Sequence, residues 1–340
     1  MIVGAPATKK QPQKTGQALF KPALPSTLIL LVCVLTFIFL ALFGCASEKP
    51  ASNDKGTERI RVITTVFASY DFAKQVAGPH AEVRMLTSPG SDIHSFEPTP
   101  QDILDIENCE FFIYVGGESD EWVKDLLDSI DTSGIVILRL FDCVEVRDED
   151  DSVLVDPNLW AGGEKETDEH VWTSMRNAKL ITRAISDRFK ELDPKNTEEY
   201  EANTQAYLRE LDELDSMFKK IVAEGKSRPL VFGDRFPFFY FADEYGLRCY
   251  AAFPGCSTAT EPSARTIALL IDLVKAEHIP VVFYLEMSNQ RLADTIAEET
   301  GAKTLLLHSC HTVSRQDFES GETYVSLMRK NAQNLKAALS

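Results

Sequence analysis

The sequence lacks the two commonest signatures of a protein zinc centre. No two of its seven cysteines have the CxxC spacing of a cysteine-based zinc site, and no His-Glu-x-x-His run occurs. A zinc hydrolase would also need three protein ligands, an open position for water and a nearby general base. We therefore expect neither a zinc finger nor an enzyme.

The chain also lacks an excess of positive charge. Its net charge of -17 argues against nucleic acid and anionic lipid surfaces as partners. Acidic residues gather between Glu145 and Glu169, most densely at Asp148-Glu149-Asp150-Asp151. This pattern favours a solvated loop, and the alternative is an electrostatic collar that concentrates cations near a site.

The first 26 residues contain lysines but no acidic residue. The apolar run that follows has roughly 16 residues, short for a free-standing membrane helix of about 20, and is typical of a secretory leader. It ends in Leu42-Phe43-Gly44-Cys45, which resembles the bacterial lipobox. We expect residues 1–44 to be a signal peptide, Cys45 to carry a lipid and 45–58 to be a flexible tether. An uncleaved signal anchor is the alternative.

Strand-like and helix-like segments alternate through the rest of the chain, which predicts an α/β fold with parallel sheets. The rhythm runs from Val62 to Leu140 and restarts at Leu230. We expect an N-terminal lobe over 59–175, linker helices over 176–226 and a C-terminal lobe over 227–340. Each lobe should hold a mostly parallel sheet with flanking helices.

The clearest helical pattern lies between these lobes, from Asp193-Pro194 to Gly225. Its apolar residues recur at three- and four-residue spacing, which lines one face of a helix. A helix of about 28 residues is about 42 Å long. We interpret it as a rigid strut between two lobes, with a helix packed on one lobe alone as the alternative.

Candidate ligands lie in loops. His94 follows Pro89-Gly90 and His170 ends Asp168-Glu169-His170, and imidazole is the commonest protein ligand for zinc. Ligands of parallel sheets bind beyond the carboxyl ends of the strands. In the C-terminal lobe those ends carry Asp234, Glu286 and His308. The two sets predict a metal site in the cleft between the lobes.

These residues resemble the metal-binding solute-binding lipoproteins of bacterial ABC transporters, over about Arg61 to Leu339. The resemblance is carried by His94-Ser95-Phe96-Glu97-Pro98-Thr99-Pro100, by Asp168-Glu169-His170-Val171-Trp172 and by Phe283 to Glu286. It implies that His94 and His170 are metal ligands.

The C-terminal lobe departs from that family's pattern. Arg235 stands where the family usually has a histidine, and His308 stands where it usually has an aspartate. The third and fourth ligands must therefore come from Asp234, Glu286, His308 or His311. We expect His308 as the third imidazole with Glu286 or Asp234 as the carboxylate, although Glu286 could instead pair with Arg235.

The resemblance implies an extracytoplasmic, membrane-anchored zinc receptor that delivers its ion to an ABC permease and its ATPase. Three imidazoles with one carboxylate suit tetrahedral zinc, and manganese prefers more oxygen donors. The alternatives are a manganese receptor of the same fold and a surface adhesin. We expect a monomer.

Five cysteines lie beyond Cys45, so in an exported chain at least one is expected to be free or to pair elsewhere. Cys256 and Cys310 both fall in loops on the expected cleft side of the C-terminal lobe. We expect a disulfide between them.

Overall fold

The computed structural model describes residues 59–91, 96–148, 167–253 and 262–340. All of them belong to one compact unit, Thr57–Ser340. None of the helices in these ranges combines the length and the apolar run that crossing a bilayer needs. The expected leader and tether lie outside the described residues.

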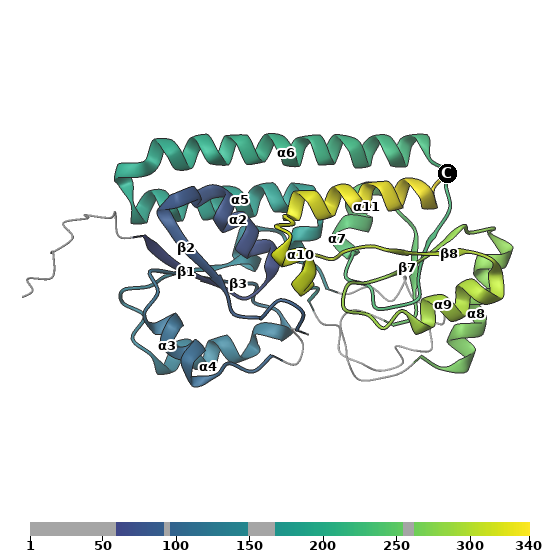
Figure 1. Cartoon of the computed structure of the whole chain (residues 1–340), viewed down its shortest axis with the longest axis horizontal. Coiled ribbons are helices and arrows are strands. Elements are labelled where there is room, and N and C mark those ends of the chain that lie inside the picture. The colour runs from purple at the N-terminus through teal and green to yellow at the C-terminus, as the bar shows by residue number, and fades with distance from the viewer. Residues whose placement is uncertain (1–58, 92–95, 149–166, 254–261) are drawn as a thin grey trace, which may run out of the picture. The chain divides into compact units, whose positions relative to one another are not determined.

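The described residues form two four-stranded parallel sheets with the same winding order (Figure 1). The first has the order β2-β1-β3-β4 and the second β6-β5-β7-β8. Their strands are β1 (Ile60–Thr64), β2 (Ala81–Met85), β3 (Phe111–Tyr114), β4 (Val136–Arg139), β5 (Leu230–Phe232), β6 (Cys249–Ala251), β7 (Val281–Tyr284) and β8 (Lys303–Leu306). The predicted α/β architecture is confirmed.

Helices cover both faces of each sheet. The longer ones are α2 (Phe67–Ala77), α3 (Pro100–Glu107), α4 (Glu121–Ser129), α5 (Met175–Leu192), α6 (Thr197–Glu224), α8 (Ala264–Ala276), α9 (Arg291–Thr300) and α11 (Tyr324–Ala338). The shorter ones are α7 (Phe239–Tyr245) and α10 (Arg315–Glu319), with 3-10 turns η1 (Gly78–His80), η3 (Glu118–Asp120), η4 (Leu140–Cys143), η7 (Val171–Thr173) and η8 (Pro194–Asn196).

Successive residues of a strand point to opposite faces of the sheet. The apolar side chains of each strand therefore pack alternately against the helices on one face and on the other. In β1, Ile63 joins a cluster with residues of α3 and α4, whereas Val62 faces α2 and α5. In β7, Val282 likewise packs toward α8 and α9 while Phe283 faces the other way. Each sheet is therefore buried on both faces.

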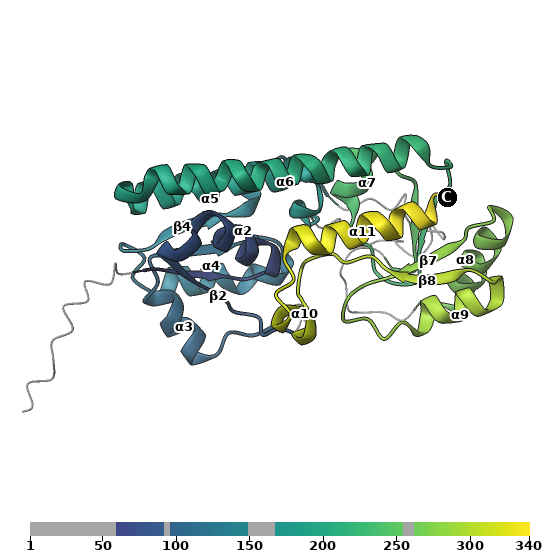
Figure 2. The ribbon, with the colours of Figure 1, turned by 45° about the horizontal axis from the view of Figure 1, so that its top comes forward.

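The inward faces of the two sheets share one hydrophobic core. The same buried cluster contains Phe111 of the first sheet, Phe283 of the second, and Phe218 and Tyr324 from the helices. Helix α6 packs against α5 and α2 and also against α11 and α7, and it extends alongside both sheets in Figures 1 and 2. The predicted long linking helix is confirmed.

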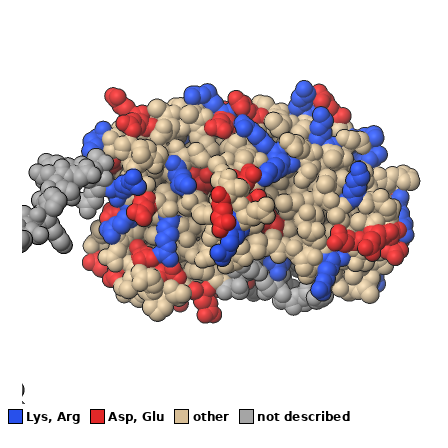
Figure 3. All heavy atoms as spheres, in the orientation of Figure 1, with Lys and Arg blue, Asp and Glu red and all other residues tan. Residues whose placement is uncertain are grey.

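The surface does not show one dominant sign of charge on the face drawn in Figure 3. Acidic and basic side chains are interspersed there, although the whole chain carries -17. Several of them form pairs along the helices, such as Lys179 with Asp212 and Lys330 with Glu322. Most of these pairs are exposed, and such pairs contribute little to stability.

Helix α2 begins without a side-chain cap. Its N-cap residue is Val66, which has no side-chain oxygen to accept from the first free N–H groups of the helix. The chain supplies acceptors from far away instead. Phe67 N donates to the His311 carbonyl (2.9 Å) and Ala68 N donates to the Cys310 carbonyl (3.1 Å). The segment after β8 therefore closes the start of α2.

Asp71 ties the same region to α6 and α11 from inside the core. Its Oδ2 accepts from Tyr324 N (3.0 Å) and from the Tyr207 hydroxyl (3.2 Å), and the residue is 4% exposed. The Tyr324 hydroxyl in turn donates to the Trp172 carbonyl (2.6 Å). Burial raises the pKa of Asp71, and its carboxyl group links the two helices as a hydrogen-bond acceptor.

We expect Asp71→Ala to lower the free energy of unfolding by roughly 2 to 4 kcal/mol, because it leaves two buried donors without an acceptor. Asp71→Asn keeps an acceptor oxygen and is expected to stay within about 1 kcal/mol of wild type. Urea denaturation of both variants measures the difference. Equal losses in the two variants would contradict the acceptor role.

Candidate metal centre

His170 is the N-cap residue of the 3-10 turn η7 and directly precedes it. Its backbone N donates to Asp168 Oδ1 (2.8 Å), and its Nδ1 lies 3.4 Å from the same oxygen. Both side chains are almost fully buried. A proton shared with this carboxylate would sit on Nδ1 and leave the lone pair on Nε2, which points away from Asp168. Carboxylates orient metal-binding imidazoles in this way.

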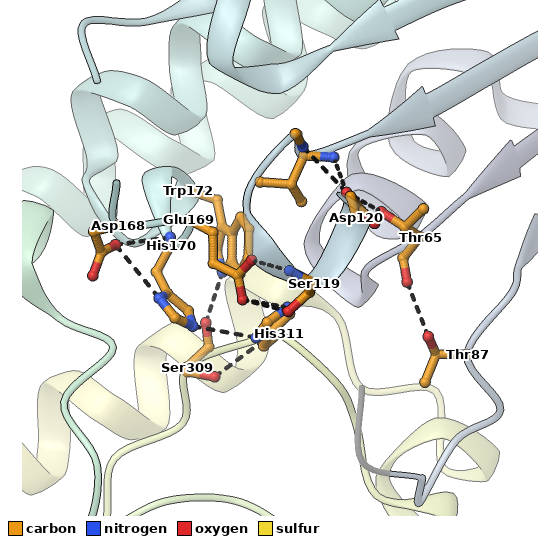
Figure 4. A network of polar contacts seen from close by, with 12 residues as sticks. Thr65, Thr87, Ser119, Asp120, Asp168, Glu169, His170, Trp172, Ser309 and His311 are labelled. Carbon is orange, nitrogen blue, oxygen red and sulfur yellow. Dashed lines mark hydrogen bonds and ion pairs between the residues drawn. The ribbon is translucent and has the colours of Figure 1, made fainter. Parts of the chain in front are cut away.

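His311 approaches His170 from the segment after β8 (Figure 4). His170 Nε2 and His311 Nδ1 are 3.2 Å apart, and the two rings are perpendicular. Trp172 lies beside both rings, with centroids 5.5 Å and 5.1 Å away. Two nitrogens bound to one tetrahedral zinc at 2.0–2.1 Å would be about 3.3 Å apart. The separation of the imidazoles therefore fits a shared ion.

Glu169 provides a carboxylate beside the two imidazoles. One potential ligand atom from each of Glu169, His170 and His311 lies within 4.8 Å of the others, and all three residues are buried. Glu169 Oε1 is 3.8 Å from His311 Nε2. Burial raises the pKa of Glu169, with the nearby His170 acting in the opposite direction. A cation in this position would favour the ionised carboxylate.

The loop after β3 fixes the direction of Glu169. Ser119 donates to it twice, from the hydroxyl to Oε1 (2.7 Å) and from the backbone N to Oε2 (3.1 Å). Gly117 leaves room for it, because a Cβ at Gly117 would lie 2.5 Å from Glu169 Cβ and 2.7 Å from Oε2. Sequence reasoning missed Glu169, although its position next to His170 and the glycine pair after β3 were visible signals.

A second carboxylate lies behind this loop. Asp120 Oδ2 accepts from Val115 N (2.6 Å), Gly116 N (3.2 Å) and the Thr65 hydroxyl (3.2 Å). Burial, and next the charge of Glu169, raises the pKa of Asp120 to about 7. Glu169 thus lies between this second acidic group and the paired imidazoles.

The structure does not group His308 with His170. Cys310 N donates to His308 Nδ1 (3.0 Å), so the lone pair of that nitrogen is in use. Asn331 also bonds both the N and the carbonyl of His308 (2.7 Å each). Among the described residues it is His311, rather than His308, that lies within hydrogen-bond distance of His170.

The two predicted carboxylate ligands also bond elsewhere. Glu286 accepts from the backbone and the hydroxyl of Ser309 and lies 3.6 Å from His308 Nδ1, so its partner is not Arg235. Asp234 accepts from Arg235 N (2.9 Å) and Leu285 N (3.2 Å). In the described part of the chain neither joins the cluster around His170.

Two expectations involve residues outside the described ranges. His94 is one of them, and its role as a ligand stays a prediction. Cys256 is the other, but its expected partner Cys310 carries a free thiol that is fully buried. The predicted disulfide is therefore wrong. The physical reason is that Cys310 lies inside the shared core, against Tyr207 and Tyr324, rather than in a loop facing outward.

Two parallel-sheet lobes joined by a long helix are the architecture of the two-lobed solute-binding proteins, and this chain holds a pair of buried imidazoles within it. The family described as "Zinc-uptake complex component A periplasmic" matches residues 62–338, and the chain belongs to that family. This confirms the resemblance inferred from the motifs.

Individual relatives agree with this assignment. The chain is 28% identical over 313 residues to the high-affinity zinc uptake system protein ZnuA of Bacillus subtilis, covering 91% of this chain and 97% of that protein. It is 30% identical over 298 residues to the zinc-binding lipoprotein AdcA of Streptococcus pneumoniae, covering 87% of this chain. The chain spans only 58% of the length of that streptococcal relative.

Solved structures show the same fold. The Zn(II)-bound ZnuA-like domain of S. pneumoniae AdcA superimposes with a TM-score of 0.69 at 30% identity, covering 83% of this chain and 99% of that domain. The metal-dependent lipoprotein YcdH of B. subtilis gives a TM-score of 0.70 at 28% identity, covering 83% of this chain and all of that one.

We expect Gly117→Ala to weaken metal binding by roughly 10- to 100-fold, because the new methyl group displaces the Glu169 carboxylate. The matched control is Gly134→Ala, where an added Cβ meets nothing within 4 Å. Calorimetric titration of both variants measures the effect. Wild-type affinity in Gly117→Ala would show that the position of Glu169 does not matter to the ion.

The pKa of Asp120 predicts a pH effect in the metal-free protein. Its folded pKa of about 7 lies above its ordinary value of 3.8, so its contribution to stability is complete below about 3.8 and is lost as the pH rises through about 7. Asp120→Asn cannot ionise. We expect the variant to gain stability relative to wild type between pH 5 and about 8, measured by thermal unfolding in chelator. A constant difference would contradict the raised pKa.

Proposed function

We propose that this protein is an extracytoplasmic zinc receptor that hands its ion to the permease of an ABC transporter. The observation that carries the proposal is the pair His170 Nε2 and His311 Nδ1, 3.2 Å apart with Glu169 beside them. The two histidines come from the two halves of the chain. An ion between them would be enclosed by residues of both lobes, as a transported solute is in a receptor.

The proposed ligand set is His170, His311 and Glu169, with His94 as a further imidazole on the grounds of its sequence motif. It replaces Glu286 and Asp234, whose carboxylates accept from backbone N–H groups, and His308, whose Nδ1 accepts from Cys310 N. Each of the three grouped residues is held by its own partner, which limits the rearrangement that binding requires.

Zinc is the ion that this donor set suits best. Imidazole nitrogens with a carboxylate oxygen make a closed tetrahedral shell of the kind zinc accepts. Manganese prefers more oxygen donors and lies below zinc in affinity at nitrogen sites. A manganese receptor of the same fold is the alternative. A filled shell leaves no position for an activated water, which supports a binding role rather than a catalytic one.

The proposed setting follows from the leader and from the family. The lipobox-like Leu42-Phe43-Gly44-Cys45 supports a lipid anchor on Cys45, and zinc-uptake components work with a membrane permease and its ATPase. We propose a monomer, because the shared core already closes both lobes within one chain.

A second candidate function is attachment to a host surface. The chain matches the laminin binding protein Lmb of Streptococcus agalactiae, described as bifunctional with adhesin and metal transporting activity, with a TM-score of 0.70 at 25% identity over 83% of this chain and all of that one. Binding of purified protein to immobilised laminin would test it.

We expect His170→Ala and His311→Ala each to weaken zinc binding by more than roughly 100-fold, because each removes a direct bond to the ion. His94→Ala is expected to behave in the same way. Competition against a chromophoric chelator measures the affinities. The control is His80→Ala, whose histidine pairs with Glu199 and is expected to leave zinc affinity unchanged.

The same titrations separate the two candidate ligand sets. His308→Ala removes no direct bond to the ion, so its loss should stay below about 100-fold. A loss equal to that of His170→Ala, with His311→Ala unaffected, would restore His308 as the third imidazole. A manganese preference in the wild-type protein would refute the zinc assignment.

A further inference from the structure

We infer that Glu286 is a positioning residue that sets the direction of His311 through Ser309. The inference rests on the proposed metal site. It gives Glu286, a candidate ligand on sequence grounds, a different task. Strands β7 and β8 are neighbours in the second sheet. Glu286 follows β7, and His311 follows β8.

The contact begins at the Glu286 carboxylate, whose side chain is 6% exposed. Oε2 accepts from Ser309 N (2.8 Å), and Oε1 accepts from the Ser309 hydroxyl. Both oxygens thus bond to the same residue. A carboxylate that accepts a backbone and a side-chain hydrogen bond from the same residue restricts both the backbone and the side chain of that donor residue.

Ser309 passes this restraint to the ligand. Its Oγ accepts from His311 N (3.2 Å), and its carbonyl accepts from Trp172 Nε1 (2.8 Å). The Ser309 hydroxyl has one proton, which it gives to Glu286, and its lone pairs remain for His311 N. The carboxylate therefore holds the hydroxyl in the orientation in which it can accept from His311.

The backbone between them needs such a restraint. Cys310 has φ of 61°, a left-handed conformation that costs free energy for a residue other than glycine and persists only when its surroundings impose it. Cys310 N bonds His308 Nδ1 and its carbonyl caps α2. This turn sends the side chain of His311 toward His170, whereas an extended chain would place residues 308 and 311 on opposite sides.

Substitutions at Glu286 distinguish a positioning residue from a ligand. Glu286→Ala and Ser309→Ala should each weaken zinc binding by roughly 10- to 100-fold, the usual effect of losing a residue that orients a ligand. Glu286→Gln keeps an oxygen that accepts from Ser309 N, so its affinity should stay within about threefold of wild type. A true ligand would lose its bond to zinc in both Glu286 variants.

Two further measurements test the path through Ser309. Because both residues act in one chain of hydrogen bonds, the double variant Glu286→Ala, Ser309→Ala should bind zinc about as well as the weaker single variant. The visible absorption of the cobalt-loaded protein reports the number and type of ligands. We expect the band positions and intensities of Glu286→Ala to match those of wild type once the site is saturated.

Asp234→Ala is the matched control. Asp234 also follows a central strand of the second sheet and accepts from backbone N–H groups, but in the described part of the chain its side chain bonds to neither Ser309 nor His311. We expect it to lower thermal stability without changing zinc affinity by more than about threefold. An equal loss of affinity in Asp234→Ala would show a general structural effect and overturn the inference.

The remaining outcomes also decide the matter. Equal, large losses in Glu286→Gln and Glu286→Ala with an altered cobalt spectrum would make Glu286 a ligand, and wild-type affinity in both alanine variants would remove any role. If Glu286→Ala does not fold, Ser309→Ala tests the same path with a smaller change. Failure of the proposed function is distinct, because His311→Ala would then bind zinc like wild type.

Discussion

The contact between the segment after β8 and the first turn of α2 is the one on which the proposed site depends. Helix α2 has no side-chain cap at Val66, and the carbonyls of Cys310 and His311 accept its first N–H groups. An uncapped buried helix start is costly, so this contact is strongly favoured. It also brings His311 from the second half of the chain to the edge of the first sheet, where His170 lies.

The larger features of the fold could be predicted from the sequence because they rest on local patterns. Strands with apolar runs, alternating with helices, specify parallel sheets, and the three- and four-residue spacing in α6 specifies one buried face along its whole length. His170 was predictable for a similar reason, since it ends a short polar motif in a loop. These signals need no knowledge of distant contacts.

The rest of the site could not be predicted because it depends on contacts between distant segments. His308 and His311 have similar neighbours in sequence, and only the left-handed turn at Cys310 decides which of them faces His170. The segment that contains this turn is held by bonds from α2 to the Cys310 and His311 carbonyls and by the bond from Ser309 to Glu286. The role of Glu169 depends on the space left by Gly117. A single sequence does not reveal such long-range geometry.

The arrangement also bears on how an ion could be released. The two imidazole nitrogens are already 3.2 Å apart, so binding would spend little of its free energy on moving the lobes and the affinity would be correspondingly high. The same rigidity opposes release. Separating His311 from His170 would require breaking the hydrogen bonds that close α2, which leaves buried N–H groups without acceptors. Release would therefore need a partner whose own contacts offset that cost, and a permease that grips both lobes could supply them.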